Sequence, residues 1–196
     1  RYSVDIRYYD EFKKGNFGID FFFKLKKILK KIFWNILRTN VTNKVRKFYE
    51  ELPFNYRSSL KNHIEKIKQN NPIEIYPCLK GLLNKQITHI DIGCGAGWFV
   101  NSLNYNYDVK STGIDFSKKS ISRAIQISKK MKLDTKFINK DFLTYDNKKK
   151  FYFVSSIGVL HHTKDCLHSI KIITKKYLKK NGYFFLGLYH KFSRKP

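Results

Sequence analysis

From residue 86 onward, short apolar runs alternate with longer amphipathic segments, and this alternation is the feature that most limits the possible folds. The apolar runs are typical of buried strands. We expect strands at 86–93, 110–117, 135–142, 150–160 and 183–190. We expect helices from about 96, from the Ser117 cap to about 132, and over about 164–178. Strands that alternate with helices form parallel sheets through right-handed crossovers. The sequence therefore predicts an α/β fold with a doubly wound sheet.

The first predicted strand leads into the sequence HIDIGCGAG, residues 89–97, in which three glycines follow an acid at every second position. Such a loop lets the backbone approach a ligand closely. The dinucleotide fingerprint needs a glycine where this chain has Trp98, so the spacing of Gly93, Gly95 and Gly97 does not fit it. The Gly-Lys-Ser/Thr sequence of a P-loop is absent as well. Neither phosphate-binding pattern therefore explains the loop.

Asp91 stands two residues before the first of these glycines, at the mouth of the loop. A carboxylate in this position repels a pyrophosphate and attracts a cation. S-adenosylmethionine carries an ammonium and a sulfonium and has no phosphate. The acid and the glycines together fit that ligand.

The motif HIDIGCGAG resembles motif I of the class I S-adenosylmethionine-dependent methyltransferases. The resemblance continues in TGIDFS after the second predicted strand and in NKDFLTY after the third. The later segments VSSIGVLHHTKD and LKKNGYFFLGLYH resemble the small-molecule branch of the family that includes quinone-biosynthetic enzymes. The resemblance covers roughly residues 84–190 and implies a Rossmann-like sheet that binds S-adenosylmethionine as its cofactor.

The resemblance also implies which residues would bind the cofactor. Asp115 would accept both ribose hydroxyls, Asp141 would accept from the adenine amino group, and Phe142 would offer backbone and ring surface to the adenine. Ser156 would contact the methionine end. The predicted cofactor-binding residues are Asp91, Gly93, Cys94, Gly95, Gly97, Asp115, Phe116, Asp141, Phe142 and Ser156.

The family's sheet has seven strands, whereas five are readable in this sequence, with the expected order 3-2-1-4-5. The last two strands would follow Pro196, so we expect a core that is incomplete at its C-terminal end. We divide the chain into a basic helical extension, residues 1–83, and a cofactor-binding core, residues 84–196.

Two histidines follow the fourth predicted strand, where an acceptor could approach the methyl group. His161 or His162 could remove a proton from the acceptor, although a general base is needed only when the acceptor must lose one. Alternatively, one of them orders the loop or contacts the methionine portion of the cofactor. A metal site is not expected, because these histidines and His168 lack paired carboxylates at ligand spacing.

The formal net charge of +25 raises the question of an anionic partner. The lysines are spread along the chain, and the composition is rich in Lys, Asn, Ile, Phe and Tyr, which favours compositional bias over a binding patch. Residues 19–38 predict a helix with an apolar stripe and a basic face. Such a helix could lie on an anionic membrane surface, or it could dock on the following domain.

The sequence thus predicts methyl transfer from S-adenosylmethionine to a small-molecule or lipid-like acceptor. The alternatives are a non-catalytic, membrane-tethered cofactor-binding domain and an RNA methyltransferase. Nucleic acid is not favoured as a partner, because no base-reading motif is present. Three cysteines without metal spacing fit a reducing compartment, so we expect a cytoplasmic protein. If the helix over residues 19–38 binds anionic lipid, the protein would be peripheral at the inner membrane face.

Overall fold

The computed structural model describes residues 47, 51 and 59–188. The chain divides into two compact units, Arg1–Asn40 and Val41–Pro196, and the described residues all lie in the second. The helix predicted over residues 19–38 lies outside the described residues. Within them, no helix is both long and apolar enough to cross a membrane.

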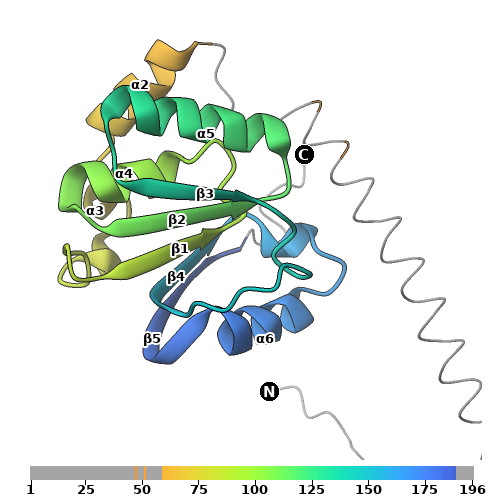
Figure 1. Cartoon of the computed structure of the whole chain (residues 1–196). Coiled ribbons are helices and arrows are strands. Elements are labelled where there is room, and N and C mark those ends of the chain that lie inside the picture. Colours follow the sequence, from red (N-terminus) through yellow and green to blue (C-terminus); the bar gives the residue numbers. More distant parts are fainter. Residues whose placement is uncertain (1–46, 48–50, 52–58, 189–196) are drawn as a thin grey trace, which may run out of the picture. The chain divides into compact units, whose positions relative to one another are not determined.

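A five-stranded parallel sheet forms the centre of the described unit, with the strand order β3-β2-β1-β4-β5 (Figure 1). The strands are β1 (Thr88–Ile92), β2 (Lys110–Asp115), β3 (Thr135–Asn139), β4 (Phe151–Ile157) and β5 (Leu178–Gly187). The order reverses next to β1, because β2 lies on one side of it and β4 on the other. The predicted doubly wound order is therefore confirmed, and it places the switch point at β1.

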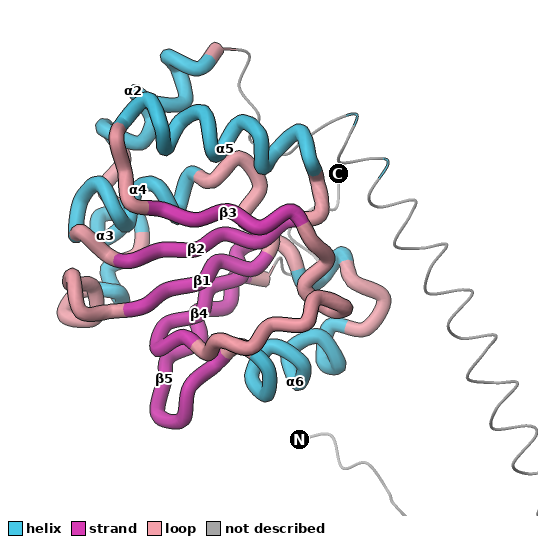
Figure 2. Tube along the Cα trace, viewed as in Figure 1, coloured by secondary structure: helices cyan, strands magenta, loops and turns pink. Residues whose placement is uncertain are grey.

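Helices cover both faces of the sheet (Figures 1 and 2). The helical segments are α2 (Leu60–Gln69), α3 (Pro72–Ile75), η1 (Pro77–Leu79), α4 (Trp98–Tyr107), α5 (Lys118–Met131), η2 (Leu160–His162) and α6 (Cys166–Lys176). The helix α2 contacts α4 and α5, whereas α6 contacts β5. Side-chain caps start several of these helices: Ser59 accepts from Asn62, Ser117 from Ser120 and Asp165 from His168.

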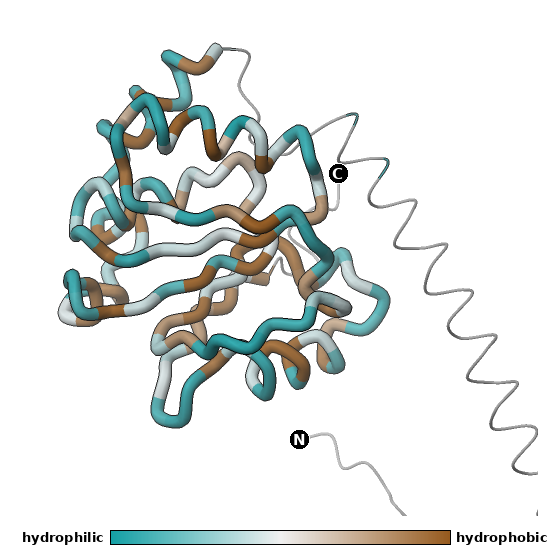
Figure 3. The backbone as a smooth tube through the Cα atoms, viewed as in Figure 1, coloured by the Kyte–Doolittle hydropathy of each residue, from teal (hydrophilic) through white to brown (hydrophobic). Residues whose placement is uncertain are grey.

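The alternation of side chains along β1 divides the core into two layers. Ile90 and Ile92 pack in the cluster that includes Ile173 and Tyr177 of the α6 side. On the other face, Phe153 of β4 packs with Phe99 of α4. Hydrophobic stretches occur on the strands, on β2 and β3 only near their carboxyl ends, and recur on α5 and α6 (Figure 3). His89 and Asp91, which alternate with the isoleucines, face the α4 side together with Phe99.

The structure differs from the predicted elements mainly at the ends of β3, β4 and β5. Strand β3 ends at Asn139 rather than at residue 142. Strand β4 ends at Ile157 rather than near residue 160, because Gly158 has a φ of 74° and turns the chain into η2. Strand β5 starts at Leu178 rather than at residue 183. Asn181 there has a φ of 61°, and the register with β4 shifts between Phe151 and Phe153.

Candidate functional site

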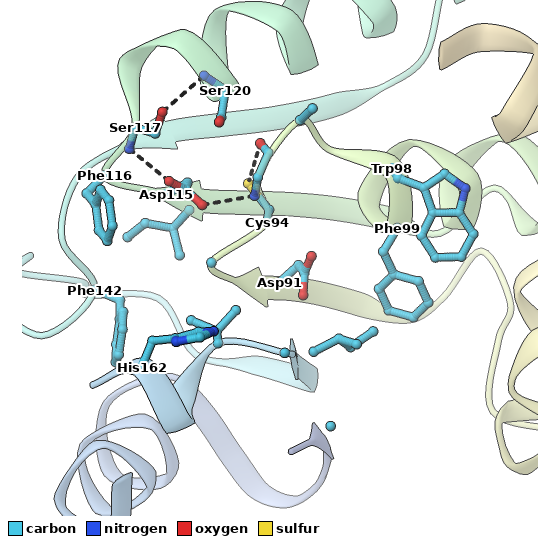
Figure 4. A pocket seen from close by; sticks show the side chains of 18 of the residues that line it. Asp91, Cys94, Trp98, Phe99, Asp115, Phe116, Ser117, Ser120, Phe142 and His162 are labelled. Carbon is cyan, nitrogen blue, oxygen red and sulfur yellow. Dashed lines mark hydrogen bonds between the residues drawn. The ribbon is translucent and has the colours of Figure 1, made fainter. Parts of the chain in front are cut away.

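A cavity of about 820 Å³ opens at the carboxyl ends of β1, β2 and β4 (Figure 4). This is the edge of the sheet where the switch point of a doubly wound fold places ligands. The volume lies within the range usual for small-molecule sites. The lining includes Asp91, Gly93, Cys94, Gly95, Trp98, Phe99, Asp115, Phe116, Lys140, Phe142, Val159 and His162.

The glycine loop after β1 forms one wall of this cavity. Gly93, Gly95 and Gly97 all have positive φ angles, of 75°, 53° and 76°. A Cβ atom at Gly93 would lie 2.6 Å from the methyl groups of Val159, and one at Gly97 would lie 2.7 Å from Cβ of Ala124. The left-handed backbone favours glycine at all three positions, and close packing against the neighbouring elements also requires it at Gly93 and Gly97.

Asp115, at the end of β2, holds the tip of the glycine loop. Its Oδ2 accepts from the amide of Gly95 at 2.9 Å, and its Oδ1 accepts from the amide of Ser117 at 2.8 Å (Figure 4). Burial raises the pKa of the Asp115 carboxyl, and these two amide bonds oppose that rise. Each carboxylate oxygen keeps a further lone pair, so the fixed carboxylate can accept from a diol in the cavity.

Asp91 lies deeper than Asp115 and is 5% exposed. Its Oδ1 accepts from the hydroxyl of Ser155 at 2.6 Å. Burial raises the pKa of the Asp91 carboxyl to about 7, the Ser155 bond lowers it, and the nearby Asp115 raises it further. A cation in the cavity would favour the ionised form of this carboxyl.

Aromatic side chains lie at both ends of the cavity. Figure 4 shows Phe116, Phe142 and His162 at one end and Trp98 and Phe99 at the other. Phe142 is buried, and its backbone carbonyl accepts from the hydroxyl of Tyr177 at 2.7 Å. These rings offer flat apolar surface to a planar ligand.

Most of the residues that the sequence predicts as cofactor-binding come together in this lining: Asp91, Gly93, Cys94, Gly95, Asp115, Phe116 and Phe142. As far as the described residues form it, the lining does not include Gly97, Asp141 or Ser156. Asp141 Oδ1 accepts from the amide of Leu143 at 2.9 Å, and Ser156 Oγ donates to the carbonyl of Ile92 at 3.1 Å. Direct cofactor contacts by these two side chains stay predictions.

The two candidate bases are placed differently. His162 is exposed and lines the cavity, whereas the lining formed by the described residues does not include His161, which is partly buried. Both histidines belong to η2, and the centroids of their rings lie 4.0 Å apart. The geometry therefore favours His162 over His161 as the histidine that a ligand in the cavity could reach.

The sequence did not indicate the contribution of α2 to this site. The cavity is lined by His63, Lys66 and Ile67 of α2, by Asn70 at the C-cap of that helix, and by Tyr76. His63 and Ile67 are both buried and lie four residues apart, the spacing that places two side chains on one helix face. That spacing, with the Ser59 cap, marks a helix in the sequence but does not show which ligand site it covers.

The chemistry of the lining fits S-adenosylmethionine better than a phosphate ligand. Two carboxylates, Asp91 and Asp115, face the cavity beside the glycine loop, where a pyrophosphate would be repelled. The same carboxylates suit an ammonium and a ribose diol, and Phe116 and Phe142 suit an adenine ring. In the part of the chain that the structure describes, no cluster of His, Cys, Asp or Glu could hold a metal ion.

Comparison with known proteins agrees with this chemistry. Residues 83–192 match the family model described as a methyltransferase domain, which is more than half of the chain. The chain belongs to the class I S-adenosylmethionine-dependent methyltransferase family. The ubiquinone biosynthesis O-methyltransferase of Pelagibacter ubique (strain HTCC1062) is 35% identical to it over 109 residues. The match covers 55% of this chain and 44% of that relative, so the chain spans less than half the length of the curated methyltransferase that it matches.

Solved methyltransferase structures share the fold at low sequence identity. A methyltransferase of Thiobacillus denitrificans in complex with S-adenosyl-L-homocysteine is 18% identical, with a TM-score of 0.51, over 66% of this chain and 55% of its own. One of Geobacter sulfurreducens in complex with the same ligand is 17% identical, with a TM-score of 0.51, over 65% and 53%. At this identity the likeness supports the fold alone.

Proposed function

We propose that this methyltransferase domain transfers a methyl group from S-adenosylmethionine to a small-molecule acceptor. The observation that carries the proposal is the arrangement of two carboxylates, Asp91 and Asp115, around the glycine loop in one cavity. The solved methyltransferases from Thiobacillus denitrificans and Geobacter sulfurreducens, which share the fold, are in complex with S-adenosyl-L-homocysteine, the product that S-adenosylmethionine leaves after methyl transfer.

Each part of the cofactor has a matching group in the lining. The Asp115 carboxylate is assigned to the ribose hydroxyls, since both of its oxygens are oriented by backbone amides. Asp91 is assigned to the ammonium group of the methionine portion. Phe116 and Phe142 are assigned to the adenine ring, and Asp141 stays a candidate for the adenine amino group.

The cofactor supplies an electrophilic methyl group on a sulfonium. The work left to the protein is to orient the acceptor and to exclude water. Apolar walls formed by Trp98, Phe99 and Val159 serve the second purpose. His162 is the group in the lining that we assign to accept a proton when the acceptor must lose one.

We infer that the acceptor atom is an oxygen of a hydroxylated aromatic molecule. The curated relative is named as an O-methyltransferase of ubiquinone biosynthesis. The rings of Tyr76, Phe99 and Trp98 form an aromatic wall, with Tyr76 and Phe99 edge to face at 6.1 Å and Trp98 stacked on Phe99 at 5.9 Å. Such a wall suits a flat apolar acceptor.

Calorimetry with S-adenosylmethionine tests the proposed function directly. The purified chain should bind it, and binding of NAD or ATP should be weaker by at least about a hundredfold, because the Asp91 carboxylate beside the glycine loop repels phosphates. If the folded protein shows no heat of binding with S-adenosylmethionine, the proposal is wrong.

Turnover tests the acceptor class. The chain would be incubated with S-adenosylmethionine and a panel of hydroxylated aromatics, with their O-methylated forms as matched controls. S-adenosylhomocysteine should form only with compounds that carry a free hydroxyl. Equal product with the O-methylated controls would exclude an oxygen acceptor. The variant His162→Gln should lower kcat by about a hundredfold with little change in KM, which separates a base from a binding group.

A further inference from the structure

A row of buried polar side chains crosses three strands of the sheet and ends at Asp91. Ser111 of β2 is the register partner of His89 of β1, and its Oγ lies 3.2 Å from His89 Nδ1. On the other side, His89 Nε2 lies 2.8 Å from Oγ of Ser155 of β4. The Ser155 hydroxyl in turn donates to Asp91 Oδ1. All four side chains are buried, and His89 and Ser155 are 0% exposed. The row thus runs without a break from the interior of the sheet to the cavity.

The hydrogens of this row have a single consistent direction while Asp91 is ionised. An ionised carboxylate can only accept hydrogen bonds, so the hydroxyl of Ser155 donates its one hydrogen to Asp91. Ser155 must then accept from His89, which requires the hydrogen on Nε2. Burial lowers the pKa of His89 to about 3, so the ring is neutral and its Nδ1 accepts from Ser111. The charge on Asp91 therefore fixes the tautomer of a histidine two residues before it in the same strand.

The other titratable groups near Asp91 do not take part in this row. Asp115 of β2 and the thiol of Cys94 in the glycine loop lie beside it, and burial raises the pKa values of both. Across the cavity stand His63 and Lys66 of α2 and His162 of η2. Burial and the Asp115 charge both raise the pKa of the Asp91 carboxyl, whereas the Ser155 bond lowers it. The row is therefore the feature of the sheet that favours the ionised carboxylate.

We propose that Ser155 and His89 are positioning residues for the cofactor: they hold Oδ1 of Asp91 toward the sheet and direct its Oδ2 to the ammonium of S-adenosylmethionine. This inference rests on the proposed function, since it assigns that ligand to the cavity. A cationic ligand needs the carboxylate in its ionised form and in one orientation. Without the row, a buried carboxyl beside a second carboxyl would be protonated over more of the neutral pH range.

A pH series of calorimetric titrations with S-adenosylmethionine tests the role of the row. Measurements between about pH 5.5 and 7.5 keep the α-amino group of the ligand mostly protonated. Affinity should rise with pH as Asp91 ionises. Ser155→Ala should weaken binding about tenfold at pH 7 and shift this rise to higher pH, because the variant loses a donor to a charged group. His89→Leu should have a smaller effect on the same rise and should weaken binding about threefold at pH 7. Ser111→Ala should have the smallest effect of the three variants on both the affinity and its pH dependence.

The matched control is Ser128→Ala. It also removes a buried serine hydroxyl with two partners, the carbonyl of Leu133 and the hydroxyl of Thr135, but at the far end of α5. This variant should bind like the unaltered chain at every pH. The inference is wrong if Ser155→Ala leaves the affinity unchanged, or lowers it by one constant factor across the pH range.

A measurement on the unaltered chain does not depend on any variant folding. Nitrogen-15 NMR of the His89 ring should report the Nε2–H tautomer at pH 8, where Asp91 is ionised. The Nδ1–H tautomer at that pH would overturn the assigned direction of the row. If the Nε2–H tautomer is found but S-adenosylmethionine does not bind, the proposed function is wrong and the direction of the row is correct. If S-adenosylmethionine binds but the ring has the Nδ1–H tautomer, the proposed function holds and the direction of the row is wrong.

Discussion

The two walls of the cavity are built by different means. Backbone groups fix the wall around β1 and β2: the amides of Gly93 and Cys94 donate to the carbonyl of Ile114, and that of Gly95 donates to Asp115. The second wall, by which we mean the rest of the lining, consists mainly of side chains of mixed chemistry from α2, the segment around Tyr76, and η2. The first wall admits one ligand shape. We expect substitutions in the α2 part of the second wall to leave the hydrogen bonds of the glycine loop intact, whereas Val159, the N-cap residue of η2, packs against Gly93.

This contrast implies a division of labour between the walls. Substitutions in the glycine-loop wall should affect cofactor binding and folding together, since the same hydrogen bonds serve both. Substitutions in the α2 wall should affect the acceptor alone. Four changes, from the largest expected effect to the smallest, can break or sharpen this division.

The largest effect is expected from Gly93→Ala. The new Cβ would lie 2.6 Å from the methyl groups of Val159, at a backbone with a φ of 75°. Left-handed backbone and overpacking together should cost about 3 kcal/mol of folding stability. Binding of S-adenosylmethionine should fall by more than about a hundredfold. Thermal unfolding and calorimetry would measure the two effects.

Gly81→Ala is the matched control for this change. Gly81 has a φ of 85°, but a Cβ there would meet no atom within 4 Å. This variant should show the backbone cost alone, about 1 kcal/mol, with unchanged cofactor affinity. Equal loss of affinity in both variants would mean that the close approach to Val159 is not what the glycine loop requires.

A smaller effect is expected from Asp115→Asn, which keeps the shape of the side chain. The amides of Gly95 and Ser117 face both side-chain oxygens, so the asparagine must turn its NH2 group toward one of these donors. The ribose also loses a charged acceptor. We expect the Kd for S-adenosylmethionine to rise about 50-fold, which corresponds to roughly 2.3 kcal/mol. Unchanged affinity would refute the assigned ribose contact.

The glycine-loop wall is also the part of the site that the sequence predicts well. The motif 89–97, the strand order and Asp115 follow from local pattern and from the family resemblance. The motif spans the end of β1 and the loop after it, and Asp115 is the last residue of β2. Strand ends of a parallel sheet share one edge, so side chains far apart in sequence converge there. The cap at Ser117 is equally local, and the structure confirms it.

The other parts of the site, the row of polar side chains and the lining from α2, depend on strand register and helix packing, which cannot be read from a single sequence. Ser155 and Ser156 are neighbours, and successive residues of a strand point to opposite faces. The sequence indicated Ser156, whose contact with the cofactor stays a prediction, but it did not indicate Ser155. The register of β4 with β1 pairs Asp91 with Ser155, and the Ser156 hydroxyl donates to the carbonyl of Ile92. The same register creates the row through His89. The part of α2 in the lining likewise depends on how that helix packs on α4 and α5.

The charge of Asp91 gives the next prediction, in the absence of ligand. Burial raises the pKa of its carboxyl from 3.8 to about 7. The folded protein thus keeps a proton that the unfolded chain releases, and the stability from this group is lost as pH rises from about 4 to about 7. The variant Asp91→Asn has no ionisable group at this position, so its stability does not fall in this way as the pH rises. Its Tm should exceed that of the unaltered chain by about 5 °C at pH 8, and by much less at pH 5.

The pH dependence makes this prediction specific. Burial lowers the pKa of His89 to about 3, so protonation of this histidine destabilises the folded protein in acid. His89 is present in both proteins, so its contribution cancels, to a first approximation, in the difference between their Tm values. Scanning calorimetry of the two proteins at both pH values would measure the difference. A Tm gain of the same size at pH 5 and pH 8 would show that packing, rather than the buried charge, distinguishes the variant.

The smallest effect on the cofactor is expected from Tyr76→Ala in the second wall. The Tyr76 ring lies 6.1 Å from that of Phe99 and 5.1 Å from that of Phe185, so its loss removes aromatic surface on the acceptor side. KM for the best hydroxylated aromatic acceptor should rise about fivefold, while the Kd for S-adenosylmethionine stays within about twofold. Tyr105→Ala, at a tyrosine that is 45% exposed, serves as the control and should change neither value. If Tyr76→Ala weakens the cofactor as much as the acceptor, the two walls do not act separately and the division of labour drawn from their construction is wrong.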